Sequence, residues 1–226
     1  MTFQSYHVST INRGLITGDR DKYFSNEKLS NDYVPIIAGS DVNRYVSQQP
    51  SEFVLFKKPK GSGGSWDPEV HLAPHKIVVR QIGTKPMASL IKEPIAVTGN
   101  LFTVRAKSIE EELYLLGIFN SRLIEFFWKV MFSDFKSSFP QVTIFSLAQV
   151  PIRPINFNDP ADKARHDKMV SLVERMLALH KSLSAARNPS EQDRLAREVQ
   201  STDGEIDRLV YELYGLSEEE IRIVEG

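Results

Sequence analysis

The stretch Lys136-Ser-Ser-Phe-Pro-Gln-Val-Thr-Ile-Phe-Ser-Leu-Ala-Gln-Val-Pro-Ile-Arg-Pro154 marks the point where the character of the chain changes. Before it lies an apolar region rich in β-forming residues, and after it a long helical region begins almost at once. A compact head that is joined to a helical arm is the arrangement expected of a recognition module with a spacer.

The length and composition describe a soluble, internal protein. The chain has 226 residues, and a head of about 150 residues buries roughly 70% of its unfolded surface, enough for a core of its own. The absence of cysteine excludes disulfides and thiolate metal sites and fits a reducing cytoplasm. No apolar run approaches the ~20 residues that span a bilayer, and Met1–Thr10 lacks the pattern of a signal peptide. We therefore expect a cytoplasmic location and no membrane partner.

The formal net charge of -1 hides a division between the two regions. Residues 1–157 contain 18 Lys and Arg against 14 Asp and Glu, a net charge of +4. Residues 158–226 contain 10 Lys and Arg against 15 Asp and Glu, a net charge of -5. A mildly positive head beside an acidic arm is compatible with a polyanion partner for the head, but +4 is far from strongly basic.

The head is expected to consist of short strands and substantial loops. β-Branched and aromatic residues gather in five runs: Val34–Ala38, Phe53–Phe56, Lys76–Ile82, Ala88–Ile91 and Leu101–Val104. Turn-forming residues separate them at Thr17–Asp19, Ala38–Asp41, Gly61–Ser65 and Thr98–Asn100. Folds of this kind display side chains on their loops.

A change of period predicts one helix from about Ile109 to Val130. Apolar residues recur three and four apart after a Ser108-x-x-Glu111 pattern that can cap a helix start. The helix carries a heavy aromatic load, including Phe119 and Trp128, which we interpret as core packing and not as a base-stacking platform, because stacking surfaces are usually sparse and exposed.

The region after Asp159-Pro160 predicts an antiparallel helical hairpin. Asp159 is a good N-cap with a first-turn proline behind it, and a narrow apolar seam follows. Asn188-Pro189 interrupts the seam, which restarts at Ser190 with Asp193 and continues along a second helix of about 25 residues, each helix being roughly 37 Å long. Gly215 ends that helix, and Ser217 with Glu220 forms a capping box for a short last helix.

No pattern in the chain predicts a catalytic or metal site. The Asp-Pro-Pro-aromatic loop and the glycine-rich strand-to-helix turn that a DNA amino-methyltransferase needs are both absent, and the Asp67-Pro68 and Asp159-Pro160 pairs are interpreted as turn and cap chemistry. Gly61–Ser65 lacks the Lys and Ser or Thr of a phosphate loop and is expected to be a flexible loop. His71 and His75 are four apart, but Pro74 disfavours the helix that would align them as metal ligands. The chain is not expected to be an enzyme by itself.

Six short strings, followed by a helical tail, carry a resemblance to a known family. In order they are Ile11–Phe24, Pro35–Tyr45, Lys76–Arg80, Asn100–Phe102, Leu115–Ser121 and Leu147–Ile152, and the tail is Glu205–Leu216. The second contains a Gly-x-Asp-hydrophobic-x-Arg-Tyr string at Gly39–Tyr45, and the specificity of the resemblance comes from the order of all six strings and not from any one. The sequence resembles the TaqI-like specificity domain, the target-recognition part of type IIG restriction-modification enzymes and N6-adenine DNA methyltransferases. It is similar, more distantly, to type I specificity subunits.

The resemblance implies sequence-specific recognition of double-stranded DNA in a restriction-modification system. The methyltransferase and nuclease that the domain serves would lie in a preceding region of a longer chain or in a separate subunit. S-Adenosylmethionine and Mg²⁺ are implied only for that catalytic region, and no cofactor is expected in this chain. The expected fold is α+β: a β-rich target-recognition head with a packed helix (residues 1–157), then an antiparallel helical hairpin or spacer and a short terminal helix (158–226).

The loops carry the side chains that duplex recognition needs, namely phosphate clamps and forked groups for base edges. The candidate DNA-contacting residues are Arg20, Lys22, Arg44, Lys57, Lys58, Lys60, Lys85, Asn100, Lys136, Ser137, Ser138 and Gln141. Lysines beside glycine suit phosphate, whereas Arg20, Arg44, Asn100 and Gln141 suit guanine or adenine edges. For each lysine a solvated surface charge is an equal alternative, and Arg44 has the alternative of an internal pair with Asp41. Arg13 is assigned to backbone geometry.

The rival hypothesis is a protein-interaction scaffold. In that interpretation the helical arm docks a catalytic subunit or a second copy of the chain, giving a homodimer, because an apolar stripe on two helices can be covered by the head, by the other helix or by another chain. The sequence leaves these alternatives open.

Overall fold

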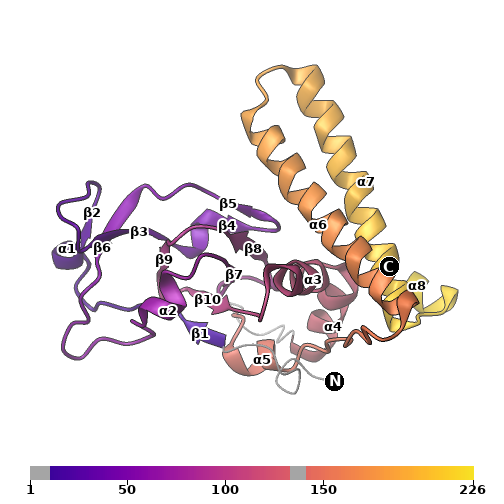
Figure 1. The fold of residues 1–226 in the computed structure, drawn as a ribbon, viewed down its shortest axis with the longest axis horizontal. Coiled ribbons are helices and arrows are strands. Elements are labelled where there is room, and N and C mark those ends of the chain that lie inside the picture. The colour runs from indigo at the N-terminus through magenta and orange to yellow at the C-terminus, as the bar shows by residue number, and fades with distance from the viewer. Residues whose placement is uncertain (1–10, 133–140) are drawn as a thin grey trace.

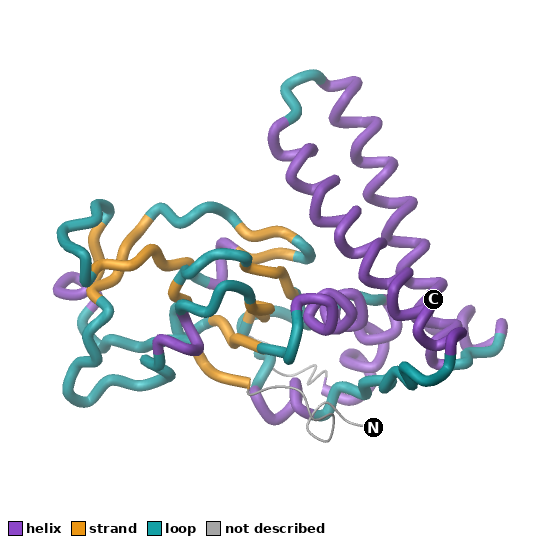
Figure 2. The backbone as a smooth tube through the Cα atoms, viewed as in Figure 1, coloured by secondary structure: helices purple, strands orange, loops and turns teal. Residues whose placement is uncertain are grey.

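The computed structural model describes residues 11–132 and 141–226, and it consists of a β-rich head from which an antiparallel helical arm projects (Figure 1). This arrangement confirms the predicted α+β class with a packed helix and a C-terminal helical hairpin. Loops make up much of the end of the head that lies farthest from the arm (Figure 2), which we call the distal end.

The strands of the head form two four-stranded sheets and one small hairpin. The first sheet is antiparallel, in the order β1 (Ile11–Arg13), β10 (Leu101–Val104), β7 (Lys76–Arg80) and β8 (Ala88–Ile91). The second has the order β2 (Phe24–Ser25), β6 (Glu52–Leu55), β3 (Tyr33–Ile37) and β9 (Ala96–Val97), with β3 and β9 parallel. The hairpin pairs β4 (Val42–Asn43) with β5 (Val46–Ser47). The five predicted strands are confirmed as β3, β6, β7, β8 and β10.

Three short helices sit on the loops of the head: α1 (Arg20–Tyr23), α2 (Pro68–His71) and α5 (Ile144–Ala148). Each begins at a polar N-cap, namely Asp19, Asp67 and Thr143, of which the first two were predicted to favour a turn or helix start. The Asp67 carboxylate, for example, accepts a hydrogen bond from the Glu69 N–H at 2.9 Å, which confirms the cap interpretation of Asp67-Pro68.

The predicted single helix at 109–130 is wrong in one respect, because it is two helices, α3 (Ile109–Phe119) and α4 (Arg122–Phe132). The break falls at Asn120, whose side-chain amide leaves the helix to bond both the N–H and the carbonyl of Ala88, at 3.0 and 2.9 Å. Ser121 then restarts the helix, since its hydroxyl accepts from the Ile124 N–H at 3.3 Å. Phe119 and Trp128 are buried on either side of the break, as expected of core aromatics.

The arm consists of α6 (Pro160–Ala185) and α7 (Pro189–Tyr214), and α8 (Glu218–Glu225) follows it. The predicted caps at Asp159, Ser217 and Gly215 are present, and Gly215 ends α7 in the left-handed conformation at φ 67°. The second long helix was predicted to restart at Ser190 with Asp193, but its N-cap is Asn188, whose side chain accepts a hydrogen bond from the Ser190 N–H. No helix among residues 11–132 and 141–226 is long and apolar enough to cross a membrane.

The main hydrophobic core joins the head to the base of the arm. One face of the first sheet packs against α3, α3 packs against α6, and α7 packs against α6 and α4, so that Val79, Leu116, Met169 and Leu209 belong to one buried cluster. Gly117 permits the close approach of α3 to α6, because a Cβ there would lie 2.5 Å from the Met169 sulfur. Two smaller clusters fill the region around the second sheet.

Candidate nucleic-acid interface

The first group of candidate residues lies at the distal end of the head, on α1. Asp19 caps this helix and presents Arg20 and Lys22 outward. Arg20 forms an ion pair with Glu52 at 2.5 Å, and its guanidinium lies over the Phe24 ring, 4.1 Å from the ring centre. Its side chain remains 55% exposed, so Arg20 is held in place on the surface and not buried.

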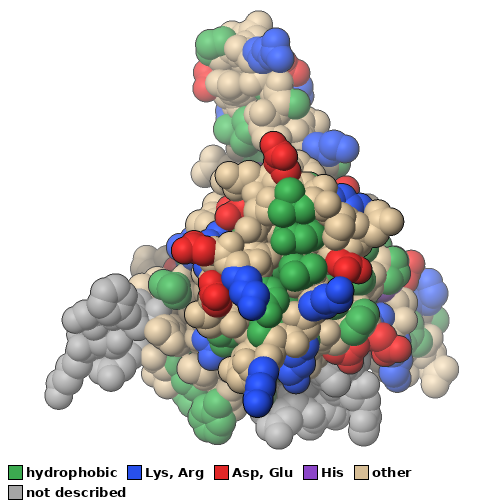
Figure 3. All heavy atoms as spheres, turned by 90° about the vertical axis from the view of Figure 1, so that its left-hand side faces the viewer, with side chains coloured by type: hydrophobic (Ala, Val, Ile, Leu, Met, Phe, Trp, Pro, Cys, Tyr) green, Lys and Arg blue, Asp and Glu red, His purple; other side chains and the backbone are tan. Residues whose placement is uncertain are grey.

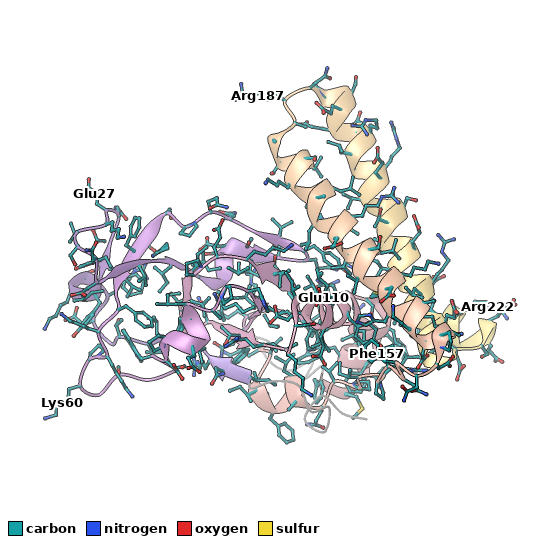
Figure 4. All side chains as sticks on the ribbon, in the orientation of Figure 1. Glu27, Lys60, Glu110, Phe157, Arg187 and Arg222 are labelled. Carbon is teal, nitrogen blue, oxygen red and sulfur yellow. The ribbon has the colours of Figure 1, made fainter. Side chains whose placement is uncertain are left out.

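Lys57, Lys58 and Lys60 lie on the loop that follows β6, and all three are exposed. Lys57 pairs with Asp32 at 3.0 Å, with both side chains more than half exposed. Lys60 points away from the body of the head (Figure 4). Together with Lys22, these lysines give the distal end several mobile cationic groups on a fixed support.

The glycine-rich segment Gly61–Ser65 is anchored along its second half, which corrects the expectation of a flexible loop. Gly63 exchanges two backbone hydrogen bonds with Ile16, at 3.0 and 3.1 Å, and the Ser65 N–H donates to the Arg13 carbonyl at 2.9 Å. Gly64 has a φ of 68° and lies so close to the chain that a Cβ would meet the Gly14 carbonyl oxygen at 1.9 Å. Glycine is required here because the backbones touch, and the contact fixes the end of the lysine loop.

A chain of forked polar side chains lies at one end of the first sheet. Arg13 ends β1, Gln81 follows β7, and Gln141 follows the segment that the structure does not describe. Arg13 donates to the Gly99 carbonyl at 2.7 Å and to Gln81 at 3.5 Å, and Gln81 donates to Gln141 at 3.5 Å. The backbone of Gln81 is itself bonded to Asn100 and Val142. Arg13 and Gln141 are exposed and Gln81 is half-buried, and the hydrogen bonds between them set their spacing.

Lys85 has a partner on α4. Its amine donates to Glu125, which also pairs with Lys129 at 2.9 Å. Burial alone would raise the pKa of Glu125, but the hydrogen bonds from the two lysines outweigh it and hold the pKa below its ordinary value. Lys85 is thus tied to the head near the chain of forked groups, with a quarter of its side chain exposed.

Two candidates are engaged inside the molecule. The Asn100 side-chain oxygen accepts from the Gly39 N–H at 2.9 Å and from the Thr98 hydroxyl at 2.5 Å. Arg44 forms a bidentate pair with Asp203 on α7, with distances of 2.8 and 3.1 Å, and not the pair with Asp41 that was the alternative. Both residues connect segments far apart in sequence, a role that sequence patterns do not reveal.

The remaining candidates, Lys136, Ser137 and Ser138, lie outside the described residues. The candidate residues therefore divide into a distal group on α1 and the lysine loop, a group of forked side chains around Gln141, and the internally engaged pair Arg44 and Asn100. The sequence analysis did not propose Arg13 or Gln81 as candidates. The position of Arg13 at the end of a strand is the sequence signal that could have indicated it.

The distal face carries charges of both signs. In Figure 3, Lys and Arg side chains alternate with Asp and Glu around a column of hydrophobic side chains, with no field of one sign. Arg20 and Lys57 are paired with carboxylates, whereas Lys22, Lys28, Lys58 and Lys60 are exposed and form no ion pair among the described residues.

A cleft of about 720 Å³ lies in the angle between head and arm. Three segments line it: residues 45–49 around β5, residues 89–95 after β8, and residues 174–184 of α6. Its polar groups include Gln48, Lys92 and Lys181. The sequence does not indicate this cleft, because three segments distant in the chain form it.

His71 and His75 have separate partners. His71 is buried, with one ring nitrogen 2.9 Å from the Ser65 carbonyl and the other accepting from the Val97 N–H at 3.2 Å. Burial lowers the pKa of His71, so the ring is neutral. His75 bonds to Glu112 at 2.9 Å. Residues 11–132 and 141–226 contain no group of three or more His, Asp or Glu that could hold a metal ion.

The family model of the TaqI-like C-terminal specificity domain matches residues 34–152, more than half of the chain. The chain belongs to this family. The matched range begins at β3 and ends after α5, so it covers most of the head. It includes the lysine loop, Gln81 and Gln141, but not Arg13 or α1.

Solved structures share the fold of the specificity domain and its arm. The type IIL restriction-modification enzyme MmeI, solved in complex with DNA, has a TM-score of 0.60 at 9% identity over 96% of this chain. The HsdS subunit from Thermoanaerobacter tengcongensis has 0.51 at 14% over 92%, and the type IIG restriction endonuclease BpuSI has 0.51 at 12% over 94%. The chain spans only 34%, 44% and 31% of their respective lengths. No curated protein sequence matches it.

Proposed function

We propose that this chain reads a specific sequence of double-stranded DNA on behalf of a methyltransferase, with or without an endonuclease, in a restriction-modification system. The proposal rests on membership of the specificity-domain family, and its catalytic partner would be supplied in the same polypeptide or as a separate subunit. Catalysis, S-adenosylmethionine and Mg²⁺ are assigned to that partner and not to this chain.

The observation that carries the proposal is the set of exposed polar side chains held on rigid backbone at the loops of the head. Lys22, Lys58 and Lys60 suit phosphate oxygens, because a flexible stem brings a point charge to the backbone of a duplex without fixing its sequence. Arg13, Gln81 and Gln141 suit base edges, because a guanidinium forks onto guanine and a side-chain amide onto adenine. We assign Arg44 and Asn100 to hydrogen bonds within the protein instead of to DNA contacts.

The scaffold alternative draws little support from the arm. Its apolar seam, including Met176 and Leu195, is buried between α6, α7 and α3, and the fully exposed residues of the two helices are polar or small. Docking or homodimerisation through the arm would therefore have to use polar surface, which is typical of weaker interfaces.

Binding of labelled duplexes, including a randomised pool, tests the proposal. We expect the isolated chain to bind weakly, with a Kd around 10⁻⁴ to 10⁻⁶ M at physiological salt, and to enrich one sequence from the pool. Replacing Lys22, Lys58 and Lys60 together by Ala should weaken binding to all sequences and reduce the slope of log K against log salt by roughly 1 for each lysine that contacts phosphate.

The matched control removes three positive charges from the arm, at Lys163, Lys168 and Arg187. It should leave both affinity and salt slope close to those of the unchanged protein. Saturating protein that shifts no duplex and enriches no sequence would overturn the proposal and favour the scaffold. Equal losses in the two triple variants would show that only net charge, and not the distal end, is involved.

A further inference from the structure

Arg44 lies between three parts of the molecule and bonds two of them at once. It occupies the turn between β4 and β5, and its guanidinium forms the bidentate pair with Asp203 of α7. The Nε and Nη2 atoms also donate to the Asn120 carbonyl at the end of α3, at 3.1 and 2.6 Å. Burial alone would lower the pKa of Arg44, but its bonds to Asp203 outweigh burial and raise the pKa, so it stays charged.

The same contacts continue into the first sheet. Asn120 bonds the N–H and carbonyl of Ala88 in β8 through its side chain. The Tyr45 N–H donates to that Ala88 carbonyl as well, at 2.8 Å. A continuous set of hydrogen bonds therefore runs from Ala88 in the sheet through Asn120 and Arg44 to Asp203 on the arm.

Tyr45 contacts the other helix of the arm, α6. Its ring is buried and stacks against His180 of α6, with ring centres 6.4 Å apart and an angle of 21° between the planes. It is the one non-glycine residue among those described with a positive φ, at 60°. A tyrosine seldom adopts this conformation, so the packing and the bond to Ala88 must hold it there.

The positions of these contacts along the two arm helices determine how the direction of the arm is held. The base of the arm is packed against α3 where Gly117 meets Met169 and Val173. Met169 and Val173 lie 9 and 13 residues after the start of α6, and Asp203 lies 11 residues before the end of α7, so Asp203 is at about the same height on the arm as the contact with α3. His180 lies 7 residues beyond Val173 on α6, about 10 Å closer to the arm tip. A rod held at one point can tilt, whereas a rod held at two separated points has its direction fixed.

We propose that Arg44 and Tyr45 are positioning residues that lock the direction of the arm, so that head and arm move as one body. The β4–β5 hairpin lies on the upper side of the head in Figure 1, beside the arm, and its turn contacts both arm helices, α7 through Arg44 and α6 through Tyr45. The inference concerns the free protein and does not depend on the proposed DNA binding.

Distances between head and arm tip test the lock directly. The sequence contains no cysteine, so two introduced cysteines give unique sites for spin labels. Glu27 at the distal end, Glu110 at the start of α3 and Arg187 at the arm tip are exposed and point outward (Figure 4). The pairs Glu27→Cys with Arg187→Cys and Glu110→Cys with Arg187→Cys report the arm's direction from two points by pulsed electron spin resonance.

The test variant is Arg44→Gln, and the control is Arg175→Gln. Arg175 faces Glu205 at 3.6 Å across α6 and α7 and makes no bond to the head among the described residues. The unchanged protein and the control should give one narrow distance distribution for each pair. The test variant should widen or shift both distributions, because α7 loses its bond to the β4–β5 turn and only the Tyr45–His180 stack still joins that turn to the arm.

A purely structural role would lower the Tm without changing the distance distributions, and that result would overturn the proposal. If Arg44→Gln does not fold, Asp203→Asn removes the ion pair while leaving the bonds from Arg44 to Asn120, and it should widen the distributions to a smaller extent. Narrow, unshifted distributions in every folded variant would show that the base alone fixes the arm.

Discussion

Asp207 of α7 carries a buried carboxylate one turn from Asp203. It is only 4% exposed, and it accepts a hydrogen bond from the Arg122 N–H at 2.8 Å. Burial raises the pKa of Asp207 to about 6, and the nearby Asp203 adds to that effect against the opposing influence of Arg44 and Arg122. The carboxylate caps the first turn of α4 but costs free energy whenever it is ionised.

Replacing Asp207 by Asn should alter the pH dependence of stability. Because the folded pKa of about 6 lies above the unfolded value of 3.8, the folded protein binds the extra proton between these pH values, and Asp207 makes stability fall as pH rises through this window. The Asn side chain of the variant does not ionise, so the variant does not lose stability in this way as pH rises. Urea unfolding at pH 4, 5, 6 and 7 should show the variant gaining on the unchanged protein by up to about 3 kcal/mol.

The control for this prediction is Glu191→Gln at the exposed start of α7. Its unfolding free energy should run parallel to that of the unchanged protein over the same pH range. Parallel curves for Asp207→Asn as well would mean that the carboxylate titrates normally, and that the surroundings of α4 and α7 do not disfavour its charge.

At the scale of residues, the sequence indicates which loops carry Lys and Arg, but not which of these side chains are already paired within the protein. Lys58 and Lys60 were predicted and are exposed. Arg44 has the same forked chemistry as a base-reading arginine, yet its partner Asp203 lies 159 positions away in the chain. No local pattern reports such a pairing, because an ion pair depends on the folded path between its two residues.

At the scale of elements, local patterns predicted strands, caps and the arm but not the pairing of strands. β-Branched runs located β7, β8 and β10, whereas the antiparallel partner of β10 is β1, some 90 residues earlier. The helix break at Asn120 was missed because the apolar spacing continues across it: α3 and α4 contribute to the same core. The Asn120-Ser121 pair, a C-cap followed by an N-cap residue, was the available signal.

Two glycines in helices give an opposed pair of predictions. A Cβ at Gly117 of α3 would lie 2.5 Å from the Met169 sulfur and 3.0 Å from a Val173 methyl, so Gly117→Ala should destabilise the protein by about 1–3 kcal/mol through overpacking. A Cβ at Gly204 of α7 would meet nothing within 4 Å, so Gly204→Ala should stabilise it by about 0.5–1 kcal/mol through helix propensity. Urea unfolding measures both.

The double variant Gly117→Ala with Met169→Ala shows whether the clash is the cause. The space left by the shortened side chain should accept the new methyl group, so the combined loss should be smaller than the sum of the two single losses. If the two losses of unfolding free energy simply add, the methyl group introduced at position 117 does not clash with Met169, and Gly117 is not needed for the contact between α3 and the arm.

For the whole molecule, the division of charge separates two surfaces. Residues 1–157 carry a net +4 and residues 158–226 a net -5. Residues 215–226 around α8, with four Glu and one Arg, supply -3 of that charge, whereas α6 and α7 together carry ten acidic and eight basic residues. At physiological salt the screening length is about 8 Å, so the arm repels a polyanion only near its own surface. Under the proposed function, the exposed acidic residues of the arm disfavour DNA along its helices.

Neutralising the arm should therefore increase non-specific binding without improving recognition. In the variant Glu174→Gln, Glu191→Gln, Asp193→Asn, three exposed acids of the arm are lost. Affinity for a randomised duplex should rise several-fold at about 50 mM salt and the gain should shrink at about 200 mM, because the removed repulsion is electrostatic. The enriched sequence should stay the same, since the loops that read it are unchanged. A new preferred sequence would mean instead that DNA contacts the arm, and the division between a reading head and a repelling arm would have to be abandoned.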